Sequence, residues 1–242
     1  MAAAGLPALG GLDGVEIKLN FDAAQIDDAL RVFGFAAGEG KPRRIWFGEV
    51  LDGVGGPGAL PLSTRGIVLR VRAKKNGGDV TVKLRCADGG IDVPAWREGA
   101  GRNQNAKIEG DWAGKRLVSA SLGDDFNQAA MRELEAAHPS IASLLSSEQH
   151  SLAEQLLIPL GRVTLLGPIS AQKWEAGNGG DVEAEMWEVD TLRFLEISAL
   201  VTEDPSGVME QLRQRAEKGG LKIAAGQDTK TTTVLQHLAA KP

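Results

Sequence analysis

The sequence predicts an α+β protein built on an eight-stranded, largely antiparallel β-barrel, closed or nearly closed into a tunnel, with helices packed outside. Three observations favour this fold class. Predicted strands carry apolar residues at every second position, with charged residues between them. A helical segment separates an early group of strands from a later group. No shift in composition marks a linker, so we expect residues 13–242 to form one domain after a flexible lead-in over residues 1–12.

Composition narrows the class of protein. The chain has 242 residues, of which 43% are hydrophobic, and its net charge is −5. This charge argues against a general affinity for duplex nucleic acid or for an anionic membrane. The single cysteine, Cys86, excludes an intramolecular disulfide and fits a reducing compartment. No signal-peptide pattern or membrane-length apolar run is present. We therefore expect a cytoplasmic protein with no membrane partner; the oligomeric state stays open, and a homodimer is compatible with the sequence.

The first predicted elements are a strand and a helix. Over residues 14–21, apolar residues alternate with polar ones that include Glu16 and Lys18. Asp22 and Gln25 then have the spacing of a capping box, which predicts the start of a helix.

A β-hairpin is predicted over residues 66–85. Asn76-Gly77 and Gly77-Gly78 are both acceptable two-residue turns, because these residues tolerate positive φ. Either turn puts cations directly opposite one another and collects four of them on one face: Arg70, Arg72, Lys83 and Arg85. Like charges directly opposite in a sheet are destabilising. The face is therefore either open to water or part of a site for a polyanion.

The remaining elements follow from periodicity and from Gly and Pro residues. Further strands are predicted over residues 43–51, 106–112, 161–169, 170–176, 181–190 and 193–201. A helical segment is expected from about residue 124 to 159, and it is broken near Pro139 because proline disfavours helix in the preceding residue. Two later helices are expected, one beginning at Asp204 or Ser206 and one over residues 231–240. Loops are expected over residues 52–66 and around 97–106.

Other chemical signals in the sequence are weak. The three histidines, His138, His150 and His237, have no metal-type spacing, and no nucleophile-elbow pattern supports a catalytic triad. The glycine-rich segment over residues 53–58 lacks the Gly-Lys-Ser/Thr of a P-loop. Cys86 is interpreted as a small packing residue.

The recurring signal is a charged face on strand after strand. A single such strand is typical of a sheet face in water. Repetition over seven strands instead favours a barrel whose lumen is charged and whose apolar face packs against helices. Cations in the lumen would hold phosphate oxygens, and carboxylates would hold a divalent metal, for which oxygen ligands indicate Mg²⁺ or Mn²⁺.

The order of these strands resembles the CYTH superfamily, also called triphosphate tunnel metalloenzymes. Members share an N-terminal Glu-x-Glu-x-Lys strand, an Arg-x-Arg strand, a Lys-bearing strand, a Glu-x-Glu strand, a basic strand after the helices and a late Phe-x-Glu-x-Glu strand. The similar segments here lie within residues 14–200 and read GVEIK, LRVR, VKLR, KIEGD, GRV and FLEIS.

The resemblance implies an eight-stranded tunnel that binds a triphosphate compound, nucleotide or polyphosphate and hydrolyses it with one or two divalent cations, Mg²⁺ or Mn²⁺. It implies six phosphate-binding residues: Lys18, Arg70, Arg72, Lys83, Arg85 and Arg162. It implies catalytic roles for Glu16, Glu109 and Glu196. It implies four metal-binding carboxylates: Glu16, Asp111, Glu185 and Glu196.

Two positions depart from the family pattern. Gly14 stands where the first family glutamate is expected, and Ser198 stands in place of the last one. Fewer acidic ligands lower metal affinity, so the cationic half of the expected site is more complete than the acidic half. Three functions and a structural alternative stay open: a metal-dependent triphosphatase, a non-catalytic nucleotide or polyphosphate sensor, an adenylate cyclase-like lyase, and a plain structural domain.

Overall fold

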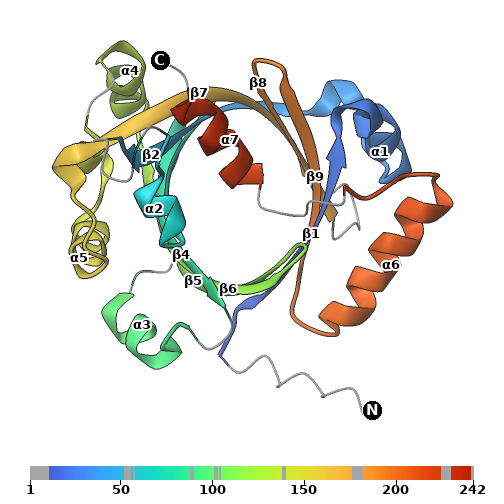
Figure 1. Cartoon of the computed structure of the whole chain (residues 1–242), viewed down its shortest axis with the longest axis horizontal. Coiled ribbons are helices and arrows are strands. Elements are labelled where there is room, and N and C mark those ends of the chain that lie inside the picture. The colour runs from blue at the N-terminus through green and yellow to red at the C-terminus, as the bar shows by residue number, and fades with distance from the viewer. Residues whose placement is uncertain are drawn as a thin grey trace.

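Nine β-strands close into one barrel within the residues that the computed structural model describes, namely 11–51, 56, 58–87, 90–100, 103, 105–137, 140–175, 182–224 and 230–240 (Figure 1). The strands are β1 (Gly14–Asp22), β2 (Lys41–Val50), β3 (Ile67–Lys74), β4 (Gly77–Ala87), β5 (Ala106–Trp112), β6 (Arg116–Phe126), β7 (Val163–Trp174), β8 (Val182–Val189) and β9 (Leu192–Val201). Their order around the barrel is β1-β5-β6-β4-β3-β2-β7-β8-β9, and β9 pairs with β1. The β1–β5 pair is parallel and the other pairs are antiparallel.

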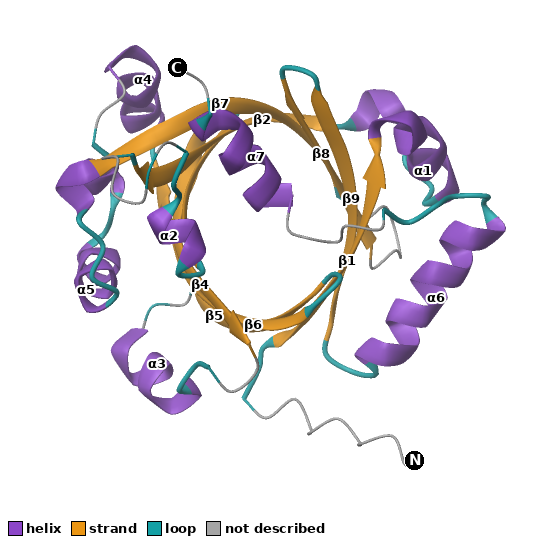
Figure 2. Cartoon of the chain, viewed as in Figure 1, coloured by secondary structure: helices purple, strands orange, loops and turns teal. Residues whose placement is uncertain are grey.

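The described helices surround this barrel, with one exception at its opening (Figure 2). They are α1 (Ile26–Val32), α2 (Pro61–Thr64), α3 (Val93–Ala100), α4 (Gln128–Ala137), α5 (Ser147–Gln155), α6 (Pro205–Lys218) and α7 (Lys230–Ala239). Short 3₁₀ turns are η1 (Ala23–Gln25), η2 (Ala37–Glu39), η3 (Ile141–Leu144) and η4 (Leu160–Arg162). No helix in the described part of the chain is long and apolar enough to cross a bilayer.

The predicted barrel is confirmed, but the strand number was wrong. The predicted barrel has eight strands, whereas the observed barrel has nine. The individual strand segments named from the sequence also differ from the structure: β6 was missed, and the two segments predicted over residues 161–169 and 170–176 are one continuous strand, β7. The segment expected as a loop around residues 97–106 includes the end of α3. Most of the predicted lead-in, residues 1–10, and the predicted helix break at 138–139 lie outside the described residues.

The outer face of the barrel is apolar and is covered by helices, as predicted. Val15, Ile17 and Leu19 of β1 are buried in one cluster with residues of α1 and α6. On the other side, Leu69 and Val71 of β3 belong to a cluster with residues of α4 and α5. Burial of each of these side chains contributes about 1.5–3 kcal/mol to the stability of the fold, and this burial holds the helices against the barrel. Because side chains alternate along a strand, the residues between them face the barrel interior.

Helix α7 is the exception to the prediction that helices pack outside. Its Val234, Leu235 and Leu238 are buried in a cluster that includes Phe47 and Trp187, two residues that line the central cavity. Figure 1 shows α7 across the barrel opening. The apolar face of α7 therefore packs on inward-facing residues of the barrel wall.

The packing of α5 on the barrel depends on one buried amide. The Gln149 side chain is 0% exposed, and its Nε2 donates to the carbonyl oxygens of Val80 (3.0 Å) and Leu122 (2.9 Å). We expect Gln149→Ala to lower the free energy of unfolding by about 2–3 kcal/mol, because it removes two buried hydrogen bonds and the capping contact of the Gln149 side chain with Ser146. Urea denaturation checks this, with exposed Glu154→Ala on the same helix as a control that stays within about 0.5 kcal/mol of wild type. An equal effect of both changes would contradict this role.

Candidate functional site

The barrel interior contains a cavity of about 360 Å³ that is lined largely by charged residues. This volume lies within the usual range of small-molecule sites, about 300–1,000 Å³. Four of the cavity's cations lie on two neighbouring strands, and four of its carboxylates lie on four other strands. We call the residues from β3 and β4 the basic wall: Arg70, Arg72, Lys83 and Arg85. We call the residues from β1, β5, β8 and β9 the acidic wall: Glu16, Glu109, Glu185 and Glu196. The predicted charged lumen is therefore present.

The register of the β3–β4 hairpin differs from both predicted registers. Lys74 pairs with Gly77, so the turn residues are Lys75 and Asn76, and Arg72 lies opposite Asp79. Gly77 and Gly78 belong to β4 because Phe126 of β6 lies against them: a Cβ on Gly78 would come within 2.2 Å of the Phe126 ring. The hairpin therefore avoids the direct cation pairs that either predicted turn required.

Asp79 neutralises the outer part of the basic wall. Its Oδ2 lies 2.9 Å from both Arg72 Nε and Lys74 Nζ, and its Oδ1 lies 3.9 Å from an Arg70 nitrogen. Burial alone would raise the pKa of Asp79, but Arg72 and Arg70 lower it below its usual value. Period-two alternation from Lys83 places Asp79 on the same face, so this residue was identifiable in the sequence.

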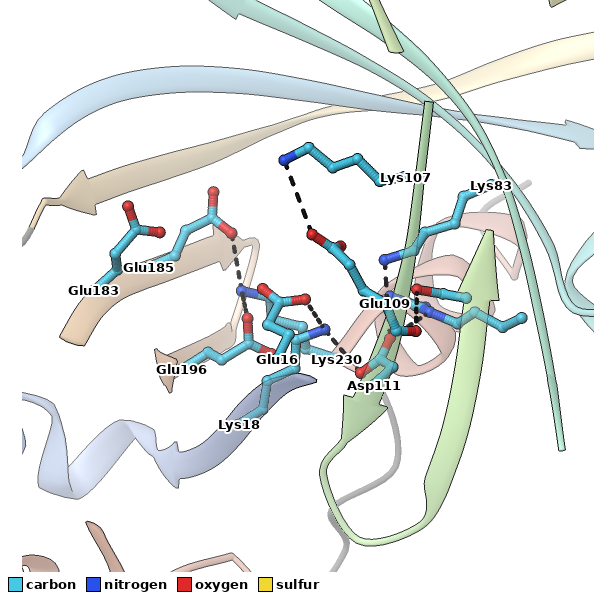
Figure 3. A network of polar contacts seen from close by, with 12 residues as sticks. Glu16, Lys18, Lys83, Lys107, Glu109, Asp111, Glu183, Glu185, Glu196 and Lys230 are labelled. Carbon is cyan, nitrogen blue, oxygen red and sulfur yellow. Dashed lines mark hydrogen bonds and ion pairs between the residues drawn. The ribbon is translucent and has the colours of Figure 1, made fainter. Parts of the chain in front are cut away.

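Asp111 of β5 is a buried carboxylate next to Lys83 and Arg85 of the basic wall (Figure 3). Its Oδ1 accepts a 2.8 Å hydrogen bond from Lys18 Nζ, and its Oδ2 lies 2.8 Å from Arg85 Nε and 3.9 Å from Lys83 Nζ. The side chain is 3% exposed. Burial alone would raise the pKa of Asp111, but Lys18 and Arg85 hold it well below its usual range.

Two cations of the basic wall are short of negative charge. Burial lowers the pKa of Lys83 to about 8, and Arg85 and Lys18 add to the effect. Burial and then Arg72 lower the pKa of Arg70, whose Nε is buried without a hydrogen-bond partner among the described residues. The positive charges of Lys83 and Arg70 are therefore destabilised by burial and by neighbouring cations. An anion bound beside them would offset this destabilisation.

The acidic wall has internal cations of its own. Lys18 Nζ lies 2.7 Å from Glu16 Oε2, and Lys230 Nζ of α7 lies 3.0 Å from both Glu185 Oε2 and Glu196 Oε1. Burial would raise the pKa values of Glu16 and Glu185, but Lys18 and Lys230 outweigh it, and each pKa falls to about 2.

Glu109 differs from the other acidic residues. Its nearest described cation is Lys107, whose Nζ lies 3.9 Å from Glu109 Oε1. Burial raises the pKa of Glu109, and the neighbouring Glu16 raises it further. Glu109 is therefore the residue of the acidic wall with the least compensating positive charge.

The four predicted metal ligands do not fit a divalent cation as a set. Carboxylate oxygens suit Mg²⁺ or Mn²⁺. However, Asp111, Glu16, Glu185 and Glu196 are each in contact with a lysine or arginine nitrogen. Within the described ranges no three acidic, histidine or cysteine residues converge as metal ligands. The expected Mg²⁺ or Mn²⁺ stays a prediction.

Comparison with known proteins identifies the fold. No family model and no curated protein matches the sequence significantly. Among solved structures, a candidate adenylate cyclase from Bacillus halodurans aligns with a TM-score of 0.60 and 14% identity, over 91% of this chain and 97% of the other. A candidate adenylyl cyclase from Hippeastrum, described as having a dominant triphosphatase activity, aligns with a TM-score of 0.61 and 14% identity, over 91% and 94%. The chain has the CYTH fold.

Most of the residues that the CYTH resemblance singled out meet in one cavity. Lys18, Ser198 and the residues of both walls line it, and the buried Asp111 contacts Lys18 and Arg85 from among them. Arg162 does not belong with them: it is in η4, its side chain is exposed, and it is not a cavity-lining residue. The CYTH resemblance implied its phosphate contact through the segment GRV on a strand predicted over residues 161–169, but β7 begins at Val163.

The sequence interpretation missed Lys230 in this CYTH barrel. It is the first residue of α7, and its side chain is 6% exposed. The segment around it has no charged alternation, and its partner Glu185 lies 45 residues away in the sequence. Only the packing of α7 on the barrel brings Lys230 to the acidic wall.

Proposed function

We propose that this chain binds a triphosphate-bearing compound through the basic wall of its tunnel. The observation that carries the proposal is the convergence of Arg70, Arg72, Lys83 and Arg85 on one cavity, where burial and the neighbouring cations lower the pKa of Lys83 to about 8. An added polyanion would relieve this repulsion, and the neighbouring arginines suit bidentate contacts with phosphate oxygens. The triphosphatase activity described for the structurally similar Hippeastrum protein supports a triphosphate as the ligand class.

Titration calorimetry tests the proposal with inorganic triphosphate, thiamine triphosphate, ATP and orthophosphate, each in EDTA and in excess Mg²⁺. We expect at least one triphosphate compound to bind about 100-fold more tightly than orthophosphate, because several cations then act on one ligand. Equal, weak binding of all four ligands would contradict the proposal.

Hydrolysis of the bound triphosphate is the second candidate function. The observation that favours it is Glu109, a cavity-lining carboxylate whose raised pKa marks a shortage of positive charge around it. Glu109 would contribute a carboxylate ligand to a divalent cation there, and such an ion would neutralise developing charge on phosphate oxygens. Phosphate release that requires Mg²⁺ or Mn²⁺ and falls strongly in Glu109→Gln would support hydrolysis. Formation of cyclic AMP from ATP would instead identify a lyase, and binding without turnover would identify a sensor.

Triphosphate binding is expected to weaken as the pH rises above about 8. Below this pH Lys83 is charged in the free protein; above it, binding must take up a proton, because the ligand favours the ammonium form. We expect the affinity to fall by up to about tenfold per pH unit between about pH 8 and 10. Calorimetry over this range checks the slope, and Lys83→Met should flatten it. A wild-type affinity independent of pH would exclude a role for the Lys83 charge.

A further inference from the structure

Two carboxylates face each other directly on the acidic wall. Glu185 of β8 and Glu196 of β9 are Cα partners in the antiparallel pair, and both side chains enter the cavity. Their side chains are 17% and 12% exposed, so water screens them little. Like charges opposite one another in a sheet are destabilising, and more so in an enclosed site. The pair therefore requires a cation between its members.

The Lys230 side chain supplies that cation. Its Nζ lies 3.0 Å from Glu185 Oε2, to which it donates a hydrogen bond, and 3.0 Å from Glu196 Oε1. The same nitrogen lies 4.3 Å from the centroid of the Trp187 ring. An ammonium has three donors and no acceptor, so two carboxylates and an aromatic face match its bonding capacity. Figure 3 shows the nitrogen between the two carboxylates.

The helix that carries Lys230 is anchored independently of this contact. Val234, Leu235 and Leu238 of α7 are at most 8% exposed and pack on the barrel wall. Burial of three aliphatic side chains contributes several kcal/mol, of order 1.5–3 kcal/mol each. The position of the ammonium therefore follows from apolar packing of α7, and the loss of the charge alone leaves this anchor in place.

We infer that Lys230 occupies the position of a divalent cation between Glu185 and Glu196, so that this part of the tunnel contains a built-in cation instead of a metal. A metal bound to the same oxygens would approach them to about 2.0–2.1 Å and would overlap the ammonium. The consequence for the ligand rests on the proposed function: a triphosphate compound binds without a metal ion at this pair.

Manganese titration followed by electron paramagnetic resonance tests the inference without any phosphate ligand. In wild type we expect no Mn²⁺ binding that depends on Glu185. In Lys230→Met we expect a new site, with Mn²⁺ bound at least about tenfold more tightly than by wild type, because two carboxylates have lost their cation. The double variant Lys230→Met/Glu185→Gln should lose this gain. Lys74→Met, which removes a lysine from β3 on the same cavity, is the matched control and should show no gain.

Two results would overturn the inference. One is Mn²⁺ binding by wild type that weakens in Glu185→Gln, and the other is a folded Lys230→Met protein without increased Mn²⁺ affinity. Circular dichroism shows whether Lys230→Met folds. If it does not, Glu185→Gln in the wild-type background decides: unchanged Mn²⁺ behaviour supports the inference, and weakened binding contradicts it.

A separate experiment tests the consequence for the ligand. We expect any difference in triphosphate affinity between EDTA and Mn²⁺ to be the same in wild type and in Glu185→Gln, within about threefold, because no metal is held at this pair. A difference present in wild type that disappears in Glu185→Gln would contradict the consequence. Absence of triphosphate binding under both conditions would refute the proposed function alone, because the manganese titration contains no triphosphate.

Discussion

Replacement of Asp111 with asparagine is expected to lower the free energy of unfolding by about 3–5 kcal/mol. Asparagine has nearly the same size, so the change removes a charge and leaves the packing intact. Lys18 and Arg85 then lose the carboxylate that lies 2.8 Å from each, and Lys83 loses its nearest described counter-ion. Lys18 keeps its 2.7 Å ion pair with Glu16, so the expected cost comes mainly from Arg85 and Lys83, which stay buried without the Asp111 carboxylate.

Urea denaturation followed by tryptophan fluorescence measures this effect at neutral pH. Asp125→Asn is the control, because its side chain is 79% exposed and its ion pair with Lys74 is 3.4 Å long; we expect a change within about 0.5 kcal/mol. An Asp111→Asn protein within about 1 kcal/mol of wild type would show that the cations do not depend on this carboxylate.

The pH dependence of the same difference provides a second check. The pKa of Asp111 is lowered in the folded protein, so its stabilisation is complete above the ordinary value of 3.8 and is lost as the pH falls below it. We therefore expect the stability difference between wild type and Asp111→Asn to be full at neutral pH and to shrink in acid. A difference that grows in acid would contradict the assignment.

The strands that were predicted from the sequence share one physical property. Their lumen positions carry charges, as at Arg70 and Arg72 of β3, while their outer positions are apolar. In a barrel with a polar interior, the side-chain period of two is therefore visible in the sequence of each strand separately. The apolar positions of β1 and β3 are confirmed in clusters with the helices.

Strand β6 lacks that signal. Its cavity-lining residues Ser121 and Gly123 are small and uncharged, and its charged lining residues, Asp124 and Asp125, are adjacent at its end and do not alternate; Ala120 and Leu122 are buried on the other face. The small residues leave space in the lumen for the long side chains of the basic wall, since Lys83 lies opposite Ser121. A search for charged alternates therefore misses β6, although the barrel requires it.

Long-range contacts set the rest of the site. The hairpin turn could not be chosen from its glycines, because Gly77 and Gly78 are needed where Phe126 of β6 lies against them. The contact of Lys230 with the acidic wall depends on α7 packing inside the barrel opening, and local sequence does not encode that position. The cationic half of the site was predictable because its charges follow one hairpin.

Replacement of Lys83 with methionine is expected to separate stability from binding. Burial and the neighbouring cations Arg85 and Lys18 lower the Lys83 pKa to about 8, so at neutral pH Lys83 is charged in the folded protein and its charge costs stability relative to the unfolded chain. Removal of the charge should therefore raise the free energy of unfolding by about 1–3 kcal/mol at pH 7. Asp111 retains its contacts with Lys18 and Arg85, so the variant leaves no carboxylate without a partner.

The same change should weaken triphosphate binding by about 100-fold, or about 2.7 kcal/mol, because one buried charge-assisted contact to the ligand is lost. Calorimetry measures the affinity and urea denaturation the stability of the same preparation. Lys75→Met is the charge-matched control: its side chain is exposed in the hairpin turn and is not part of the cavity lining. If Lys83→Met lowers stability and leaves the affinity unchanged, Lys83 is a structural cation and the basic wall does not bind the ligand. A gain in stability together with a loss of affinity would show that the Lys83 charge destabilises the fold and contributes to ligand binding. No purely structural role of Lys83 predicts both changes.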